Sequence, residues 1–240
     1  MNTTLLDASV RLRIDLAYDG TPFRGFARQP GDLPTVQGAL EGALSRLLGQ
    51  EAVTTGAGRT DRGGHASAQV VHVDVDAGVE RAARLLGDLD DLRRRLDRLV
   101  GDAITVWAVR AVSDDFDARF SATERRYRYR LSDAPDLHPL DRFAVWHVGE
   151  PLSVGRMRAA ARHLLGEHDF TSLCRAVPGR TNVRRVDEVT LARRDAEIHV
   201  RVRGPAFCHQ QVRSMVGVLV EVGRGRRDAA WAAAVLAARD

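Results

Sequence analysis

The chain has 240 residues, of which 44% are hydrophobic and 28% charged, a balance typical of a folded globular protein rather than a disordered one. Its 36 basic residues are all arginine and exceed the 32 acidic residues, for a net charge of +4. The absence of lysine excludes Schiff-base chemistry and lysine-dependent ATP sites, whereas the basic balance fits an anionic partner such as nucleic acid.

The first half of the chain mixes strand and helix patterns. Alternation and helical spacing predict a strand at 11–19, a helix at 36–48, a short strand at 52–55, a strand at 71–76, a helix at 79–99 and a strand at 104–112. Thr35 is the expected N-cap of the first helix, and Gly49 is its expected end.

The second half repeats this organisation. Its predicted elements are a strand at 125–131, a helix at 153–165, strands near 183–191 and 198–202, and helices at 209–222 and 228–238. The predicted fold is mixed α+β (α/β), with two similar lobes that share a mainly antiparallel sheet, helices on one face and a central basic cleft. The predicted lobes are residues 1–115 and 116–240.

The densest group of reactive residues is the segment 56–66, Gly-Ala-Gly-Arg-Thr-Asp-Arg-Gly-Gly-His-Ala. Its glycines permit positive φ and close approach of the backbone to a ligand. Arg59 and Arg62 flank Asp61 and favour the ionised carboxylate, so Asp61 is a candidate nucleophile or base. The alternative is an ordinary tight turn with a solvated arginine–aspartate pair.

A second segment combines aromatic and basic residues on a predicted strand. Alternation separates them onto two faces, with Tyr127 and Tyr129 on one and Arg126, Arg128 and Arg130 on the other. Aromatics beside arginines suit nucleic acid, through base stacking and phosphate pairing. The alternative is an amphipathic strand with its tyrosines in the core and its arginines in water.

Arg213 stands on an apolar stretch of a predicted helix. Its helical neighbours Val216, Gly217 and Val220 are apolar or lack a side chain. Because an unpaired buried charge is costly, we expect an acidic partner for Arg213. Asp61 is one candidate, and a structural carboxylate elsewhere is the alternative.

Several other features are expected to be absent. No apolar run reaches about 18 residues, and the N-terminus lacks a secretory signal, so we expect a cytoplasmic protein with no membrane span. Cys174 and Cys208 form no C-x-x-C motif, and the histidines show no metal-ligand spacing, so neither a disulfide framework nor a metal site is expected. No dinucleotide-binding or serine-hydrolase motif occurs.

These segments together resemble the tRNA pseudouridine synthase A family. The most specific match is Gly58 to Ala66. Further matches occur in the family's order between about residue 11 and residue 240, at Tyr18-Asp19-Gly20, Phe23 to Phe26, Val36-Gln37, Phe116 to Thr123, Arg126 to Tyr129, Gly166 to Ser172 and Phe207 to Gly223.

The resemblance implies an isomerase that converts uridine to pseudouridine at positions 38–40 of the tRNA anticodon stem-loop. It further implies a homodimer that binds tRNA across both subunits, without a metal or an organic cofactor. By motif, Asp61 is the nucleophile and Tyr127 packs on the target base. The resemblance also pairs Arg213 with Asp61 and puts Arg59 near the flipped nucleotide.

Alternatives remain at this stage. Family members normally continue past the position of Asp240 into another strand, so one alternative is a non-catalytic or disabled tRNA-binding protein with a short C-terminus. Another is a carboxylate-dependent nucleotide or glycoside hydrolase, which would need two carboxylates flanking the bond. We find no convincing second carboxylate to act with Asp61 in these motifs. Whether Asp61 attacks the ribose or C6 of uracil stays open.

Overall fold

The computed structural model of the chain describes residues 9–175, 179 and 181–240. The chain divides into two compact units, Met1–Ala122 and Thr123–Asp240, which we call the N-terminal unit and the C-terminal unit. Each unit combines helices with its own four-stranded sheet, which confirms the α+β class. In the described part of the chain, no helix is both long enough and apolar enough to cross a membrane.

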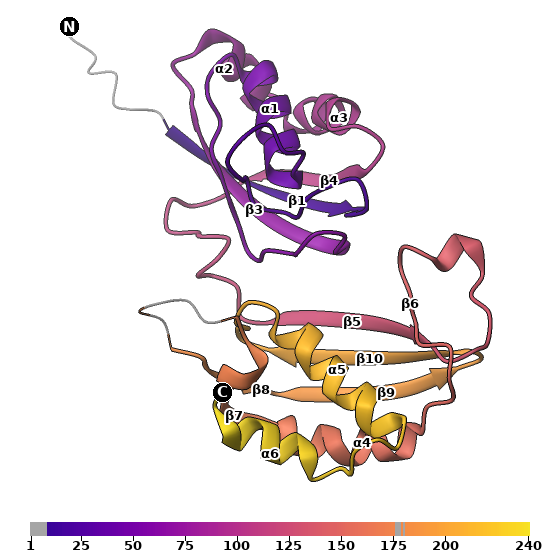
Figure 1. Cartoon of the computed structure of the whole chain (residues 1–240). Coiled ribbons are helices and arrows are strands. Elements are labelled where there is room, and N and C mark those ends of the chain that lie inside the picture. The colour runs from indigo at the N-terminus through magenta and orange to yellow at the C-terminus, as the bar shows by residue number, and fades with distance from the viewer. Residues whose placement is uncertain (1–8, 176–178, 180) are drawn as a thin grey trace, which may run out of the picture. The chain divides into compact units, whose positions relative to one another are not determined.

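The N-terminal unit has three helices on one face of its sheet (Figure 1). Its elements are β1 (Ser9–Tyr18), α1 (Val36–Leu48), β2 (Thr54–Gly56), β3 (Ala66–Asp76), α2 (Glu80–Leu86), α3 (Leu89–Leu99) and β4 (Ile104–Ala111). The strand order is β2-β3-β1-β4, and every pair is antiparallel. Alternate β1 residues such as Leu12 and Ile14 are fully buried beneath helix residues such as Leu40 and Leu44.

The ends of α1 follow from local sequence. The Thr35 side chain accepts a hydrogen bond from the Gly38 N–H, and Gly49 adopts the left-handed conformation at the C-terminal end, with φ of 72°. Both predicted caps are therefore confirmed. The single predicted helix at 79–99 is wrong, because it is two helices that break at Gly87, after which Asp88 caps α3 by accepting from the Asp91 N–H.

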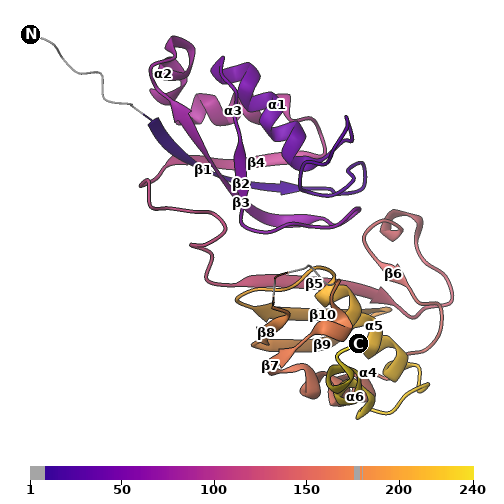
Figure 2. The same cartoon turned by 60° about the vertical axis from the view of Figure 1, so that its left-hand side comes forward.

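The C-terminal unit has its longer helices, α4, α5 and α6, on one face of its sheet (Figure 2). Its elements are β5 (Arg125–Ser132), β6 (Trp146–His147), α4 (Val154–Ala161), β7 (Gly166–Asp169), β8 (Val183–Val186), β9 (Glu188–Arg194), β10 (Glu197–Gly204), α5 (Gln211–Gly223) and α6 (Trp231–Ala238), with short 3-10 turns at Pro139–Asp141, Arg162–Leu164 and Thr171–Leu173. The main sheet has the order β6-β5-β10-β9, and β7 and β8 form a separate ribbon.

The strand pairing corrects two expectations. The described strands form a separate sheet in each unit, instead of one sheet shared by two lobes. The predicted strand at 183–191 is two strands, because the chain leaves the β7–β8 ribbon at Asp187 and then joins the main sheet beside β10. Pairing is mainly antiparallel as expected, and only β6 runs parallel to its neighbour β5.

The segment that follows β4 packs on the N-terminal sheet through His72. His72 is buried, and its Nδ1 accepts a hydrogen bond of 2.9 Å from the Ala118 N–H, while its ring contacts Phe116 edge-on. These contacts keep residues 113–122 with the N-terminal unit, which ends at Ala122, whereas the expected lobe boundary lay at residues 115 and 116.

His72 is expected to make stability depend on pH. Burial, with the nearby positive charge of Arg11, lowers the pKa of His72 below its ordinary value, so the folded protein resists protonation of this ring. The contribution is fully present above the unfolded pKa of about 6.5 and is lost as pH falls toward the folded pKa. In urea unfolding at pH 7.5, 6.5 and 5.5, wild type should lose more stability than His72→Gln. Parallel pH profiles for the two proteins would rule this out.

Candidate active site

The loop that carries Asp61 connects β2 to β3 and is held in place by its neighbours. The Phe26 N–H donates to the Thr60 carbonyl at 3.0 Å, and the hydroxyls of Tyr18 and Thr60 lie 2.9 Å apart. The Gln69 side-chain amide donates to the Gly58 carbonyl at 2.9 Å. Asp61 therefore follows directly on a backbone segment that is held at Gly58 and at Thr60.

A close backbone approach completes this arrangement. The Gly20 N–H donates to Nδ1 of His65 at 3.2 Å, and a Cβ atom at Gly20 would lie only 2.0 Å from the Gly64 carbonyl oxygen. The structure thus explains the glycine of the motif Tyr18-Asp19-Gly20, because any residue with a Cβ atom at this position would prevent the chain after β1 from lying so close to the loop.

The side chains of the loop differ in exposure. Asp61 is half-buried, whereas Arg59 and Arg62 are exposed. Neither arginine forms an ion pair with any residue that the structure describes, so the alternative of a solvated arginine–aspartate pair within the loop is not observed. The two guanidinium groups are therefore available to an anionic ligand beside the Asp61 loop.

Tyr127 lies on β5 in the C-terminal unit. It is paired with Val202 of β10 and packs half-buried against the hydrophobic core, with its ring edge-on to Phe207 at 5.2 Å between centroids. The predicted separation of tyrosines and arginines is confirmed, because Tyr127 shares its sheet face with buried residues while Arg128 is exposed on the other face. The tyrosines thus combine a core contact with partial exposure.

Arg213 lies in the first turn of α5, and its side chain is exposed. Its exposure removes the reason to expect a partly buried ion pair, because the buried face of this helix is formed by residues such as Val212, Met215 and Val216. A structural carboxylate partner is not present among the described residues of the C-terminal unit. A pairing between Arg213 and Asp61 stays a prediction, since the two residues belong to different units.

The start of α5 is tied to a distant loop. Cys174 and Cys208 form a disulfide with a Cα–Cα distance of 5.9 Å, and the Arg175 N–H donates to the His209 carbonyl at 3.0 Å. The expectation that these two cysteines form no disulfide is therefore wrong, because the fold brings together residues that are 34 positions apart in the sequence. It anchors the segment that leads into Arg213.

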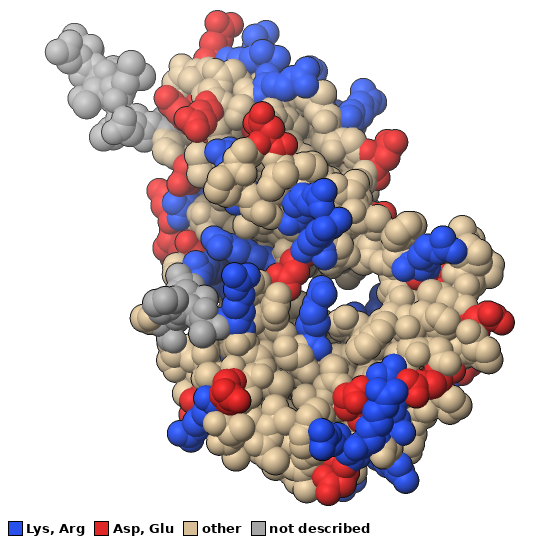
Figure 3. All heavy atoms as spheres, viewed as in Figure 1, with Lys and Arg blue, Asp and Glu red and all other residues tan. Residues whose placement is uncertain are grey.

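Arginines also gather on the open sheet face, which we define as the face of the C-terminal sheet opposite the buried Val200 and Val202. Its cross-strand residues are Arg126, Arg128 and Arg130 of β5, and His199, Arg201 and Arg203 of β10. Sequence reasoning missed the β10 members, although the alternation of valine and arginine in that strand signals them. On the molecular face in Figure 3, basic and acidic side chains are interspersed, so local pairing decides which arginines remain free to bind.

Part of this face is neutralised. Arg130 donates to both carboxylate oxygens of Glu197, at 2.8 and 2.6 Å, and to Asp141 at 3.0 Å. The hydrogen bonds from Arg130, with a smaller contribution from His199, lower the pKa of Glu197 to about 2. No group of three or more histidine, cysteine or acidic side chains that could hold a metal ion occurs within the ranges that the structure describes.

Known proteins resemble this chain over nearly all of its length. Residues 160–240 match the family described as tRNA pseudouridine synthase. The tRNA pseudouridine synthase A of Frankia casuarinae is 47% identical over 235 residues, which are 97% of this chain and 82% of that protein. The protein of the same name from Caulobacter sp. strain K31 is 42% identical, over 96% of this chain and 90% of that protein. The one from Corynebacterium glutamicum is also 42% identical, over 96% of this chain and 82% of that protein.

The similarity extends across both units, from the N-terminal sheet that carries the Asp61 loop to the C-terminal sheet that carries Tyr127. Identity above 40% over more than nine-tenths of the chain is decisive for membership. The chain therefore belongs to the tRNA pseudouridine synthase A family.

Proposed function

We propose that the protein isomerises uridine to pseudouridine at positions 38–40 of the tRNA anticodon stem-loop, with Asp61 as the nucleophile. The observation that carries this proposal is the similarity to tRNA pseudouridine synthases over both units, together with a half-buried carboxylate on a loop held at Gly58 and at Thr60. Arg59 and Arg62 add positive charge where a polyanion would approach.

The reaction balances without an external reagent. The N-glycosidic bond of uridine breaks, the uracil turns while it remains bound, and C5 of the base bonds to the same ribose carbon. C5 loses a proton, and N1, which is no longer bonded to the ribose, gains one. The reaction therefore involves no net gain or loss of protons, and nothing is oxidised or reduced. The proposal accordingly includes no metal and no organic cofactor. The Asp61 carboxylate attacks either the ribose carbon or C6 of uracil, and both routes use the same residue.

The remaining roles follow the family's motifs. Tyr127 packs on the target base, and its edge-on contact with Phe207 restricts the motion of its ring. Arg213 pairs with the Asp61 carboxylate, and Arg59 contacts the flipped nucleotide. Unstacking the target uridine costs a few kcal/mol, which arginine–phosphate contacts offset. The working form in this proposal is a cytoplasmic homodimer with tRNA bound across both subunits.

The test is incubation of the protein with an anticodon stem-loop transcript that carries labelled uridine, followed by nucleoside analysis. Pseudouridine formed at positions 38–40 without free uracil supports the proposal. Release of free uracil would replace it with a hydrolase. Tight, salt-dependent binding with unchanged uridine would replace it with a tRNA-binding protein that lacks activity.

A further inference from the structure

The arginines of the open sheet face differ in whether carboxylates neutralise them. Arg126 forms a close ion pair with Glu124, and its cross-strand partner Arg203 lies 3.5 Å from Glu124 and 3.2 Å from Glu188. Asp187 also lies 3.8 Å from Arg203, so three carboxylates neutralise this pair at one end of the face.

At the other end, the cross-strand pair is Arg130 and His199. Glu197 lies 2.6 Å from Arg130 and 2.9 Å from His199, and Asp141 adds a second carboxylate at 3.0 Å from Arg130. This pair is also neutralised, so Arg130 has a structural role in holding β5 to β10 and to the turn at Asp141.

The pair between them, Arg128 and Arg201, is different. These residues are directly opposite each other on β5 and β10, and both are exposed. Opposed side chains on antiparallel strands have Cβ atoms about 4.5–5.5 Å apart, so two like charges there destabilise the sheet. Neither side chain has a hydrogen-bond or ion-pair partner among residues 9–175, 179 and 181–240, and the other neighbour of Arg201, Thr190 on β9, is uncharged.

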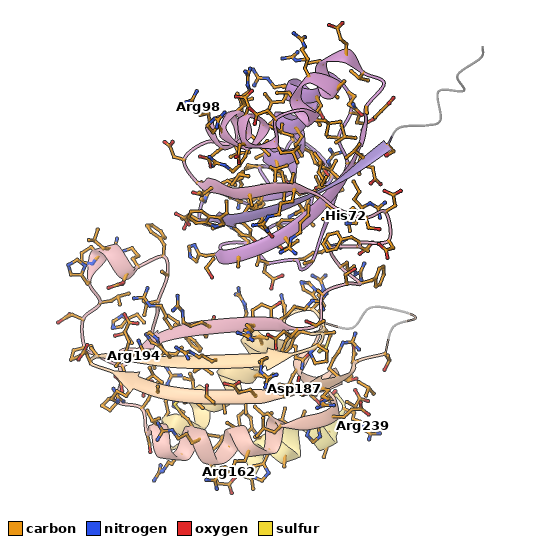
Figure 4. The ribbon with its side chains drawn as sticks, turned by 180° about the vertical axis from the view of Figure 1, so that it is seen from behind. His72, Arg98, Arg162, Asp187, Arg194 and Arg239 are labelled. Carbon is orange, nitrogen blue, oxygen red and sulfur yellow. A yellow bond between two sulfur atoms is a disulfide. The ribbon has the colours of Figure 1, made fainter. Side chains whose placement is uncertain are left out.

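A hollow adjoins this pair. It measures about 440 Å³, and of this pair only Arg128 lines it, together with Arg130, Arg194, Asp195, Ala196, Glu197 and His199. Arg194 is exposed at the end of β9, and Glu197 is the carboxylate that already pairs with Arg130 and His199. Figure 4 shows Arg194 and Asp187 toward opposite ends of this sheet, and Arg162 on the side of the helices. The uncompensated positive charge therefore lies beside a concave surface with room for a sugar–phosphate unit.

We propose that Arg128 and Arg201 together hold a backbone phosphate of the RNA substrate, as a phosphate-binding site on the open sheet face. This inference rests on the proposed function for the identity of the RNA. Two guanidinium groups with no carboxylate between them present several N–H donors to one phosphate. The bound phosphate removes the repulsion between the opposed arginines, which explains why the pair carries no internal counter-charge.

The test is equilibrium binding of an anticodon stem-loop transcript to the full chain at several salt concentrations. Arg128→Gln/Arg201→Gln should raise Kd roughly 10- to 30-fold at 0.15 M salt. It should also reduce the slope of log Kd against log salt by about 1, because one neutralised phosphate is lost. Arg128→Lys/Arg201→Lys should restore the slope, since the charges return. Circular dichroism melting checks that each variant is folded.

Two matched control variants also lose two positive charges each, but from other positions. Arg98→Gln/Arg162→Gln removes exposed arginines from α3 and from the turn after α4, and Arg126→Gln/Arg203→Gln removes the neutralised pair. Both should change the slope by less than half as much as the Arg128/Arg201 variant. An equal effect of either control would overturn the assignment, because net charge alone would then explain it.

The outcomes separate this inference from the proposed function. If wild type forms pseudouridine but the Arg128/Arg201 variant binds with unchanged Kd and salt slope, the phosphate site is wrong and the function stands. If the Arg128/Arg201 variant binds the RNA more weakly and with the reduced salt slope, but wild type forms no pseudouridine, the phosphate site stands and the proposed function fails.

Discussion

Asp61→Asn is expected to lower the rate of pseudouridine formation by roughly 10⁴-fold or more, as the loss of a nucleophile does in other enzymes. Asparagine has the shape of aspartate but cannot attack carbon as a carboxylate does. The loop should survive the change, because its anchors are the hydrogen bonds at Thr60 and Gly58. Single-turnover assays on an anticodon stem-loop transcript measure the rate, and circular dichroism measures the folded state.

A matched control for this variant is Asp102→Asn, which removes an exposed carboxylate between α3 and β4. It should react at a rate within twofold of wild type. Should Asp61→Asn keep a rate within tenfold of wild type, the assignment of Asp61 as nucleophile is wrong. Tight RNA binding by the inactive variant would show that the loss concerns chemistry and not recognition.

Gly20→Ala is expected to damage both stability and activity. The new Cβ atom would lie 2.0 Å from the Gly64 carbonyl oxygen and 2.6 Å from its carbonyl carbon, and backbone atoms cannot rotate away as a side chain can. Relief of the clash must separate the end of β1 from the Asp61 loop. We expect a loss of about 1–3 kcal/mol in the free energy of unfolding. A displacement of about 1 Å near the nucleophile should lower the rate roughly 100-fold.

The same substitution at Gly42 provides the comparison. Gly42 is exposed in the middle of α1, and nothing lies within 4 Å of a Cβ atom built there. Gly42→Ala should leave activity unchanged and stabilise the protein by up to about 1 kcal/mol, because alanine favours helix over glycine. Urea unfolding and rate assays of both variants test the account, and equal behaviour of the two would contradict it.

Local sequence signals predicted the elements whose ends depend on near neighbours. Thr35 and Gly49 define α1 because each cap involves residues only a few positions away. The break at Gly87 and Asp88 was also present in the sequence as a glycine followed by a capping aspartate, but the continuous leucine spacing concealed it. Strand periodicity likewise predicted the buried face of β1, and it predicted that the tyrosines and arginines of β5 lie on opposite faces.

Features that depend on distant partners could not be predicted in this way. Whether an arginine on β5 is free or neutralised depends on Glu197 and Asp141, which come from other elements. The Cys174–Cys208 disulfide similarly depends on how the loop after β7 meets the start of α5. An acidic partner was expected for Arg213 because its helical neighbours are apolar, yet their burial does not extend to its side chain. In each case the sequence pointed to the residue, but it did not predict which residues contact it in the folded protein.

We propose that Asp61 of the N-terminal unit and Arg213 of the C-terminal unit act on the same uridine. The most direct test is a crystal structure of the protein bound to an anticodon stem-loop. We expect a flipped uridine against Tyr127, with the Asp61 carboxylate and the Arg213 guanidinium within about 4 Å of each other. Carboxylate and guanidinium facing unrelated surfaces, with the RNA away from both, would contradict it.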